Sequence, residues 1–180
     1  MIEAFRRNKR PLVVAGDGPG RADLARNAPS NVRFVGRVPD DELARLYRSA
    51  RALVYPQHED FGLVAVEAQA AGCPVIGFGR GGLLDTVVPL AEEADGSPGP
   101  GGADATGILF DTQTPEALCE AVERFEKHEH RFDPCGLRRW AEGFSPTRFD
   151  REFDAEIALA VGDAWKRPTP TSSQAFRRPA

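Results

Sequence analysis

The sequence predicts an α/β fold, built on a parallel sheet with helices on both faces. Three observations lead to this prediction. Short apolar runs alternate with amphipathic stretches along the chain, which is typical of strands joined by crossover helices. Glycine-rich turns follow several of the apolar runs, and 180 residues are enough for one domain with a sizeable core.

Five apolar runs are short enough and rich enough in valine, isoleucine and phenylalanine to be buried strands. They cover residues 11–15, 32–35, 51–55, 74–78 and 107–110. We expect them to form one parallel sheet of about five or six strands.

Helices are expected between these strands. One begins at the acidic residues Asp40 and Asp41, which suit the positive end of a helix. A second covers residues 62–71 and is stopped by Gly72 and then Pro74.

A third helix starts where Thr114 caps it and Pro115 takes the first helical position, and it runs to about Lys127. Another covers residues 146–164, where apolar side chains recur every four positions. Residues 92–106 and 166–180 are rich in small and polar residues and are predicted to be unstructured. Residues 1–165 are therefore expected to form the folded domain.

The bulk composition excludes several classes of protein. A net charge of −4 argues against a nucleic-acid partner. No apolar run approaches the ~20 residues that span a bilayer, and no signal peptide opens the chain, so a cytoplasmic location is expected. The three cysteines and three histidines show no metal-ligand spacing, so we expect no metal site and place the histidines at the surface.

The first candidate ligand site is the turn Gly16-Asp17-Gly18-Pro19-Gly20 after the first strand. Glycines here let backbone amides approach a phosphate closely. The spacing differs from the dinucleotide fingerprint, and a plain strand-to-helix turn explains it equally well.

The second candidate site extends from Glu59 to Glu67 across a loop and the start of a helix. The first free amides of that helix, at Gly62, Leu63 and Val64, favour a diphosphate. Glu67 can accept hydrogen bonds from both hydroxyls of a ribose, and Glu59 would face a sugar at the other end. The alternative is an acidic loop and a solvated glutamate, but the small apolar neighbours of Glu67 predict a largely buried helix.

The third feature is Gly79-Arg80-Gly81-Gly82, which follows the strand at residues 74–78. The three glycine-bearing loops should share the carboxyl-end rim of the sheet, where ligands bind in open α/β folds. Arg80 is a candidate phosphate ligand, or an exposed loop arginine.

These residues together resemble a known family. The stretch from Glu59 to Ile76, followed by Gly81-Gly82, is similar to the E-x7-E signature of the group 1 (family 4) retaining glycosyltransferases. Gly16–Pro19 matches the G-x-GP turn of that family, and residues 32–38 match its V-x-F-x-G-x-V segment. Asp85 stands where the family has glutamate, and the resemblance covers about residues 2–160.

The resemblance implies a fold and a site. The family has two Rossmann-like domains facing each other across a cleft (the GT-B fold), and its C-terminal domain, represented here, holds the donor without a metal or other cofactor. Glu67 would bind the ribose, and Glu59 would be the catalytic-site carboxylate beside the donor sugar. Further donor contacts carried over by the resemblance are Gly16, Gly18, Val38, Asp60, Phe61, Gly62 and Leu63.

The resemblance also implies what this chain does not contain. The family's donor domain begins with a strand and a loop that carries an arginine and a lysine, and both precede the segment that matches residues 1–5. The family's N-terminal acceptor domain also lies outside residues 1–180, and we expect it in the same chain or in another chain. A peripheral membrane contact through that domain stays open. We therefore expect the isolated chain to be inactive.

The resulting prediction is the donor-binding domain of a retaining glycosyltransferase. It would transfer a hexose to a glycan or a lipid-linked acceptor, with mannose from GDP-mannose favoured over UDP-sugars. The alternative is a catalytically silent nucleotide-binding or assembly module derived from the same family. A third interpretation is a GT-B epimerase or a Rossmann dehydrogenase half, and the E-x7-E spacing and the absent dinucleotide fingerprint argue against the dehydrogenase.

Overall fold

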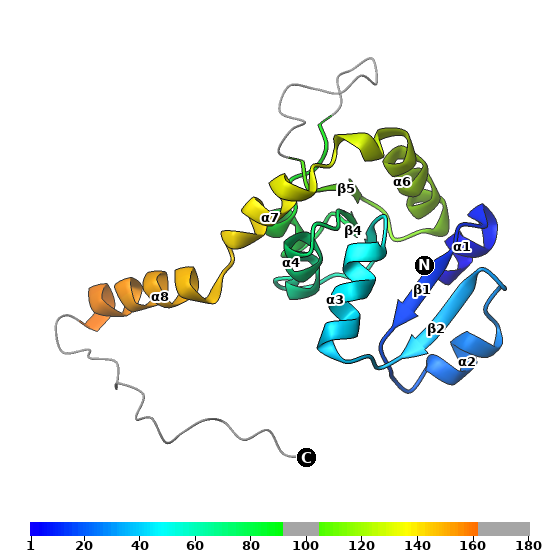
Figure 1. Ribbon diagram of the computed structural model, residues 1–180, viewed down its shortest axis with the longest axis horizontal. Coiled ribbons are helices and arrows are strands. Elements are labelled where there is room, and N and C mark those ends of the chain that lie inside the picture. Colours follow the sequence, from blue (N-terminus) through cyan, green and yellow to red (C-terminus); the bar gives the residue numbers. More distant parts are fainter. Residues whose placement is uncertain (92–104, 162–180) are drawn as a thin grey trace. The chain divides into compact units, whose positions relative to one another are not determined.

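The computed structural model describes residues 1–91 and 105–161, which belong to two compact units, Met1–Gly143 and Phe144–Ala180 (Figure 1). The described elements of the first unit are α1 (Ile2–Asn8), β1 (Leu12–Ala15), α2 (Arg21–Arg26), β2 (Val32–Gly36), α3 (Asp40–Ser49), β3 (Leu53–Tyr55), α4 (Leu63–Ala70), β4 (Val75–Phe78), α5 (Leu83–Thr86), β5 (Gly107–Phe110), α6 (Pro115–His128), a 3-10 turn (Glu129–Arg131) and α7 (Pro134–Glu142). All five predicted strands are present.

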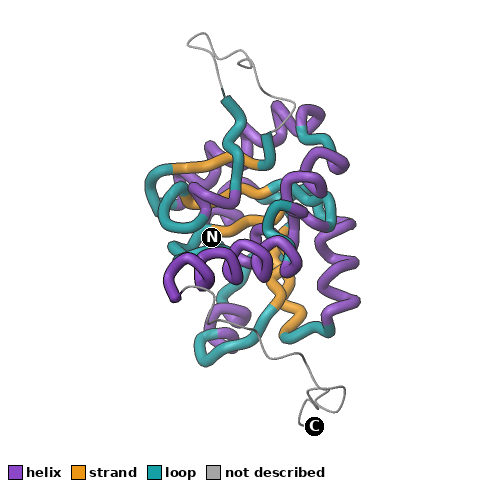
Figure 2. Tube along the Cα trace, turned by 90° about the vertical axis from the view of Figure 1, so that its left-hand side faces the viewer, coloured by secondary structure: helices purple, strands orange, loops and turns teal. Residues whose placement is uncertain are grey.

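Every strand pair in the described structure is parallel, so the predicted fold class is confirmed. The hydrogen-bonded pairing differs from the expected single sheet. Strands β1 and β2 form one ladder, and β3, β4 and β5 form a second in that order. Figure 2 shows the strands in orange with helices in purple around them. Strands β1 and β3 do not pair with each other. Residues of both strands line an apolar cavity.

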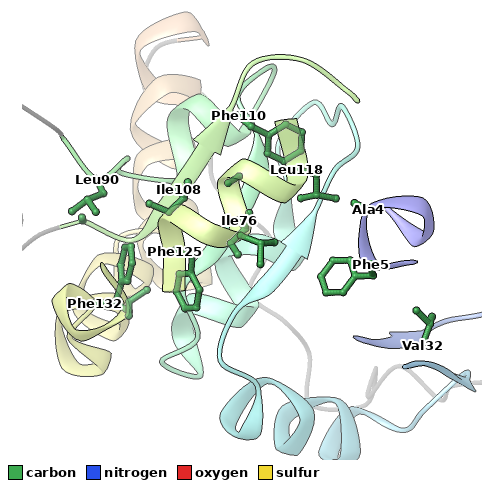
Figure 3. Packing of buried hydrophobic residues seen from close by; sticks show 14 residues of the cluster. Ala4, Phe5, Val32, Ile76, Leu90, Ile108, Phe110, Leu118, Phe125 and Phe132 are labelled. Atoms are coloured by element: carbon green, nitrogen blue, oxygen red, sulfur yellow. The ribbon is translucent and has the colours of Figure 1, made fainter. Parts of the chain in front are cut away.

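Helices cover both faces of the strands, as the alternating side chains of β4 demonstrate. Ile76 packs in the largest buried cluster with Phe5 of α1 and Phe125 of α6 (Figure 3). Its neighbour Val75 points the other way and packs with Ala65 of α4. A parallel sheet is normally buried on both faces, and this alternation achieves that burial.

The first residues of both ladders are tied to one carboxylate on α6. Arg10, just before β1, donates from Nη2 to Oε2 of Glu126 at 2.7 Å. Arg51, just before β3, donates from Nη1 to Oε1 of Glu126 at 3.1 Å. The starts of β1 and β3 therefore both lie close to Glu126.

The predicted start of α6 is confirmed: the Thr114 side chain accepts a hydrogen bond from the Ala117 amide at 3.2 Å, ahead of a proline in the first turn. The prediction did not include α7, although Asp133 caps it in the same way by accepting from the amides of Cys135 and Gly136. The prediction that all three histidines lie at the surface is wrong for His128, which is buried because α6 turns that position inward.

The described part of the second unit is α8 (Pro146–Val161), which confirms a helix at the predicted start. Its predicted end, the boundary after residue 165 and the tail at residues 166–180 lie outside the described residues, as does most of the predicted loop at residues 92–106. None of the helices in residues 1–91 and 105–161 has the length and apolarity needed to cross a bilayer.

Candidate functional site

The glycine turn after β1 is open to its surroundings. Gly16 has a φ of 120°, and its amide donates to the Gly36 carbonyl at 2.7 Å, which ties the ends of β1 and β2 together. The Asp17 carboxylate accepts from the Gly18 amide at 2.9 Å. A β-carbon built on Gly16, Gly18 or Gly20 would meet nothing within 4 Å. The glycines are therefore not required by packing inside the described structure, and the space beside them is available to a ligand.

Val38 lies on the turn between β2 and α3 and is half-buried. It follows Gly36, whose carbonyl accepts the Gly16 hydrogen bond, so Val38 and the glycine turn lie at the same end of the first ladder.

The loop that carries Glu59 is held by the glycines after β4. The Gly82 amide donates to the Glu59 carbonyl at 2.8 Å, and Glu59 and Gly81 form a parallel bridge. A β-carbon on Gly81 would overlap the Glu59 carbonyl oxygen, and one on Gly82 would overlap the backbone of Phe61. The paired glycines therefore let two loops of the predicted site approach to backbone contact.

The Glu59 side chain is half-buried and held in place by its neighbours. Gln57 donates from Nε2 to Glu59 Oε1 at 2.7 Å. The pKa of the Tyr55 phenol is raised, first by burial, while its hydrogen bond with Gln57 lowers it and the nearby Glu59 carboxylate raises it further. The Glu59 carboxylate thus sits beside a tyrosine at the carboxyl end of β3.

Helix α4 begins at Gly62, which is buried and has a left-handed φ of 86°. The Gly62 carbonyl accepts the first helical hydrogen bonds, from Ala65 at 2.9 Å and Val66 at 3.4 Å. The amides before Ala65 therefore have no carbonyl partner within the helix, as at every helix N-terminus. Phe61 and Leu63 on either side are 45% and 63% exposed, so this N-terminus is open to solvent.

Glu67 is exposed, which corrects the expectation that its helix would be buried around it. The buried face of α4 consists of Ala65, Val66, Ala68 and Gln69, and Glu67 lies on the opposite side. Its charge acts on Tyr47 of α3: burial raises the pKa of Tyr47 to about 12, and the nearby Glu67 carboxylate adds to that rise. Glu67 therefore lines the surface beside α3.

Gln69, two residues after Glu67, holds the site helix in place, a role that was not predicted from the sequence. It is fully buried, and its Nε2 donates to the Ala65 carbonyl at 2.9 Å and the Thr86 carbonyl at 3.1 Å. The same Thr86 carbonyl accepts from Nε1 of Trp140 at 2.9 Å. This network fastens α4 to α5 and α7, and a glutamine between alanines was the signal for it.

The structure brings the predicted site residues together in two groups. Glu59 and Phe61 contact the Gly81-Gly82 turn, whereas Glu67 lies further along α4. Gly16, Gly18 and Val38 form the other group on the first ladder, and no hydrogen bond among the described residues joins the two groups. Each group follows the carboxyl ends of the strands of its own ladder. Arg80 and Asp85 are exposed.

Residues 1–136 match the model of a family described as glycosyl transferases group 1. The chain belongs to this family. No cluster of metal-ligating side chains occurs within the described part of this glycosyltransferase chain.

Curated relatives support the same assignment. The chain is 34% identical over 155 residues to a D-inositol 3-phosphate glycosyltransferase from Kineococcus radiotolerans, covering 79% of this chain and 34% of the relative. It is 32% identical over 152 residues to the alpha-1,3/1,6-mannosyltransferase ALG2 of Kluyveromyces lactis, covering 82% of this chain and 28% of the relative. The chain thus spans about a third of the length of these relatives.

Solved structures share the fold. A sucrose-phosphate synthase from Thermosynechococcus elongatus superposes with a TM-score of 0.63 at 22% identity, covering 89% of this chain and 49% of that one. Anabaena Alr3699/HepE, solved in complex with UDP and glucose, superposes with a TM-score of 0.62 at 19% identity, covering 90% and 43%. The glycosyltransferase chain described here therefore has the fold of one half of a GT-B protein.

Proposed function

We propose that this chain is the donor-binding half of a retaining glycosyltransferase. It binds a nucleotide sugar, with GDP-mannose as the first candidate, and the complete enzyme transfers the hexose to a glycan or lipid-linked acceptor. The acceptor domain is supplied by further polypeptide, in the same chain or another. This division is supported by the relatives, which are about three times as long as the matched region.

One observation carries the proposal: the loop from Glu59 to Gly62 is held by backbone contact with Gly81 and Gly82 and leads directly into an open helix N-terminus. Partial positive charge gathers at the amides of a helix N-terminus, where a diphosphate binds favourably. A loop fixed by its own backbone places these amides without reorganisation, which is the condition for stabilising charge during a reaction.

The two carboxylates have separate roles in this proposal. Glu67 is exposed on α4 beyond the first turn, where its two oxygens can accept hydrogen bonds from the ribose hydroxyls. Glu59 precedes the helix and is held by Gln57, and we assign it to the sugar side of the diphosphate. The open turn at Gly16 and Gly18 and the half-buried Val38 complete the donor site, at the phosphate and base ends.

The chemistry that this site supports is loss of a nucleoside diphosphate from the anomeric carbon. Negative charge grows on the departing phosphate oxygen, and the amides at Gly62, Leu63 and Val64 are positioned to stabilise that charge. An acceptor hydroxyl must be held against the same carbon, and that task falls to the other domain. Residues 1–180 alone are therefore expected to show no transferase activity.

The donor is assigned from the relatives. Similarity to a mannosyltransferase supports GDP-mannose. A neighbour at 19% identity was solved with UDP and glucose, so UDP-glucose is the competing donor. A thermal-shift panel of GDP, UDP and ADP and their sugars distinguishes them. The result expected is a larger shift with GDP-mannose than with any UDP-sugar.

The test of function uses the chain joined to its acceptor domain. Glu59→Ala and Glu67→Ala should each lower turnover about 10²-fold or more while circular dichroism stays unchanged. Glu120→Ala, an exposed glutamate on α6, is the matched control and should retain full turnover. Donor binding without turnover in the complete wild-type protein would instead identify a catalytically silent binding module.

A further inference from the structure

The loop between β3 and α4 is tied at two points to turns that follow the other strands of its ladder. Gln113, in the turn between β5 and α6, donates from Nε2 to the Pro56 carbonyl at 2.8 Å. The Gly82 amide, after β4, donates to the Glu59 carbonyl at 2.8 Å. The strand order is β3-β4-β5, so Gln113 reaches from the turn after β5 to the residue that follows β3. The main chain from Pro56 to Glu59 is therefore fixed at both ends.

The carboxylate of Glu59 is tied within the same loop. Gln57 donates from Nε2 to Oε1 of Glu59 at 2.7 Å, which is the length of a charge-assisted hydrogen bond. Burial raises the pKa of the Tyr55 phenol, and Gln57 and Glu59 change that pKa further in opposite directions, so both side chains lie close to the phenol. The Glu59 carboxylate thus has a hydrogen-bond donor on one oxygen and a buried tyrosine beside it.

The hydrogen bonds of these two glutamines contribute little to the stability of the fold. Gln57 and Gln113 are both exposed, and substitution of an exposed polar side chain usually changes the free energy of unfolding very little. Holding a glutamine in one rotamer also costs side-chain entropy. The fully buried Gln69 differs in this respect. What the two exposed glutamines determine is therefore where Glu59 lies.

We propose that Gln57 and Gln113 are positioning residues that together hold the Glu59 carboxylate in the direction of the donor sugar. This inference rests on the proposed function, in which Glu59 lies on the sugar side of the diphosphate. Gln113 fixes the main chain of the loop, and Gln57 fixes the rotation of the carboxylate. A group that is already in place needs no reorganisation when the sugar begins to leave, and a displacement of about 1 Å can lower turnover about 10²-fold.

The first test compares a nucleotide sugar with the same nucleotide without its sugar, in the chain joined to its acceptor domain. Gln57→Met keeps the length of the side chain but removes the amide donor. Calorimetry should show about tenfold weaker binding of GDP-mannose and unchanged binding of GDP, because GDP has no sugar for Glu59 to contact. Gln113→Met should act in the same direction. If the thermal-shift panel selects UDP-glucose as the donor, UDP-glucose and UDP form the pair.

A double-mutant cycle tests whether Gln57 acts through Glu59. Alone, Gln57→Met should lower turnover about tenfold. In the Glu59→Ala protein the same substitution should change turnover less than about twofold, because the carboxylate that Gln57 positions is gone. Two residues that act independently would instead give losses that multiply. Such multiplied losses would overturn the proposal.

Thr112→Val is the matched control. Thr112 is exposed and precedes Gln113 in the same turn, but its hydroxyl donates to Oδ1 of Asp111 at 3.0 Å and not to the loop after β3. The control should leave both affinities and turnover unchanged. All variants should keep the circular dichroism and the melting temperature of the wild type, and Gln113→Met carries the same comparison if Gln57→Met does not fold.

The remaining outcomes separate this inference from the proposed function. Equal weakening of GDP and GDP-mannose binding by Gln57→Met and Gln113→Met would overturn the inference, because a general structural role affects both ligands. Wild-type affinities and turnover in both variants would also overturn it and would leave the proposed function standing. A wild-type protein that binds neither the nucleotide nor its sugar would overturn the proposed function, and this inference with it.

Discussion

A β-carbon added to Gly81 would lie 2.2 Å from the carbonyl oxygen of Glu59, so no side chain fits between the two residues. Gly81 also has a left-handed φ of 61°. Any other residue at this position would be strained by the left-handed backbone and would overlap the Glu59 carbonyl oxygen. Gly81→Ala should therefore lower the free energy of unfolding by about 2 kcal/mol or more, from backbone strain and overpacking together. Urea unfolding of the two proteins measures the difference.

Gly18→Ala is the matched control for this effect. A β-carbon at Gly18 would meet nothing within 4 Å, so the free energy of unfolding should change by less than about 0.5 kcal/mol. Equal destabilisation by both substitutions would show that the close approach of Gly81 to Glu59 is not the reason for a glycine at position 81.

Gly18→Ala also tests the donor site. If the open turn binds a phosphate or the ribose of the donor, the added methyl group should weaken nucleotide-sugar binding without lowering the free energy of unfolding. Comparative calorimetry on the wild-type and Gly18→Ala forms of the complete enzyme measures this. Unchanged affinity would remove Gly18 from the proposed site.

The placement of Glu67 beside Tyr47 has a spectroscopic signature. Burial and then the Glu67 charge raise the pKa of Tyr47 to about 12, because a nearby carboxylate disfavours the phenolate. Glu67→Gln should therefore lower the pKa of Tyr47, as measured by ultraviolet titration. The chain has two tyrosines, so the Tyr55 step serves as the internal reference. An unaltered Tyr47 titration would place Glu67 elsewhere.

Stability should fall in acid through the arginine pairs at the start of the strands. The hydrogen bond from Arg10 is the largest cause that lowers the pKa of Glu126, and that from Arg51 is the largest for Glu129. A carboxyl whose pKa is lowered on folding contributes stability above its unfolded pKa and loses it as pH falls through the folded value. The free energy of unfolding should thus decline below about pH 4.5.

Arg51→Gln should reduce this pH dependence, because its two carboxylate partners lose their charge-assisted hydrogen bonds. Arg45→Gln is the control, since Arg45 pairs with Asp41 on the exposed surface of α3. Urea unfolding at neutral pH and at about pH 3.5 gives the comparison. If both variants kept the wild-type decline in acid, the pairs of Arg51 would not contribute to it.

The strands were predictable because each is a short apolar run that ends at a turn. The start of α6 was equally clear, since Thr114 and Pro115 are residues that a helix N-terminus requires. Helix α7 carries the same signal in Asp133 and Pro134, but it was not predicted. Helix α5 has only four residues, too few for any periodicity to appear.

Other features depend on tertiary contacts that no local pattern encodes. The alanines around Glu67 indicate a helix with a buried side, but they do not specify which side, and Glu67 proved to be exposed. Gln69 is buried because it reaches the Thr86 carbonyl, seventeen positions away in the sequence. The separation of β1 from β3 is a matter of strand pairing. Short apolar runs indicate where strands lie in the sequence, but they do not specify which strand pairs with which.

The central claim, that this chain holds the donor at the open end of α4, is tested most directly by an NMR titration of residues 1–180 with GDP-mannose. We expect weak affinity, because the family resemblance assigns two cationic contacts with the diphosphate, worth about 1.5–3 kcal/mol each, to a loop that residues 1–180 do not include. The amide signals of Gly62, Leu63 and Val64 should shift most, together with those of Gly16 and Gly18. Micromolar or tighter binding would contradict the expected weakness, and shifts confined to residues away from these two loops would contradict the account itself.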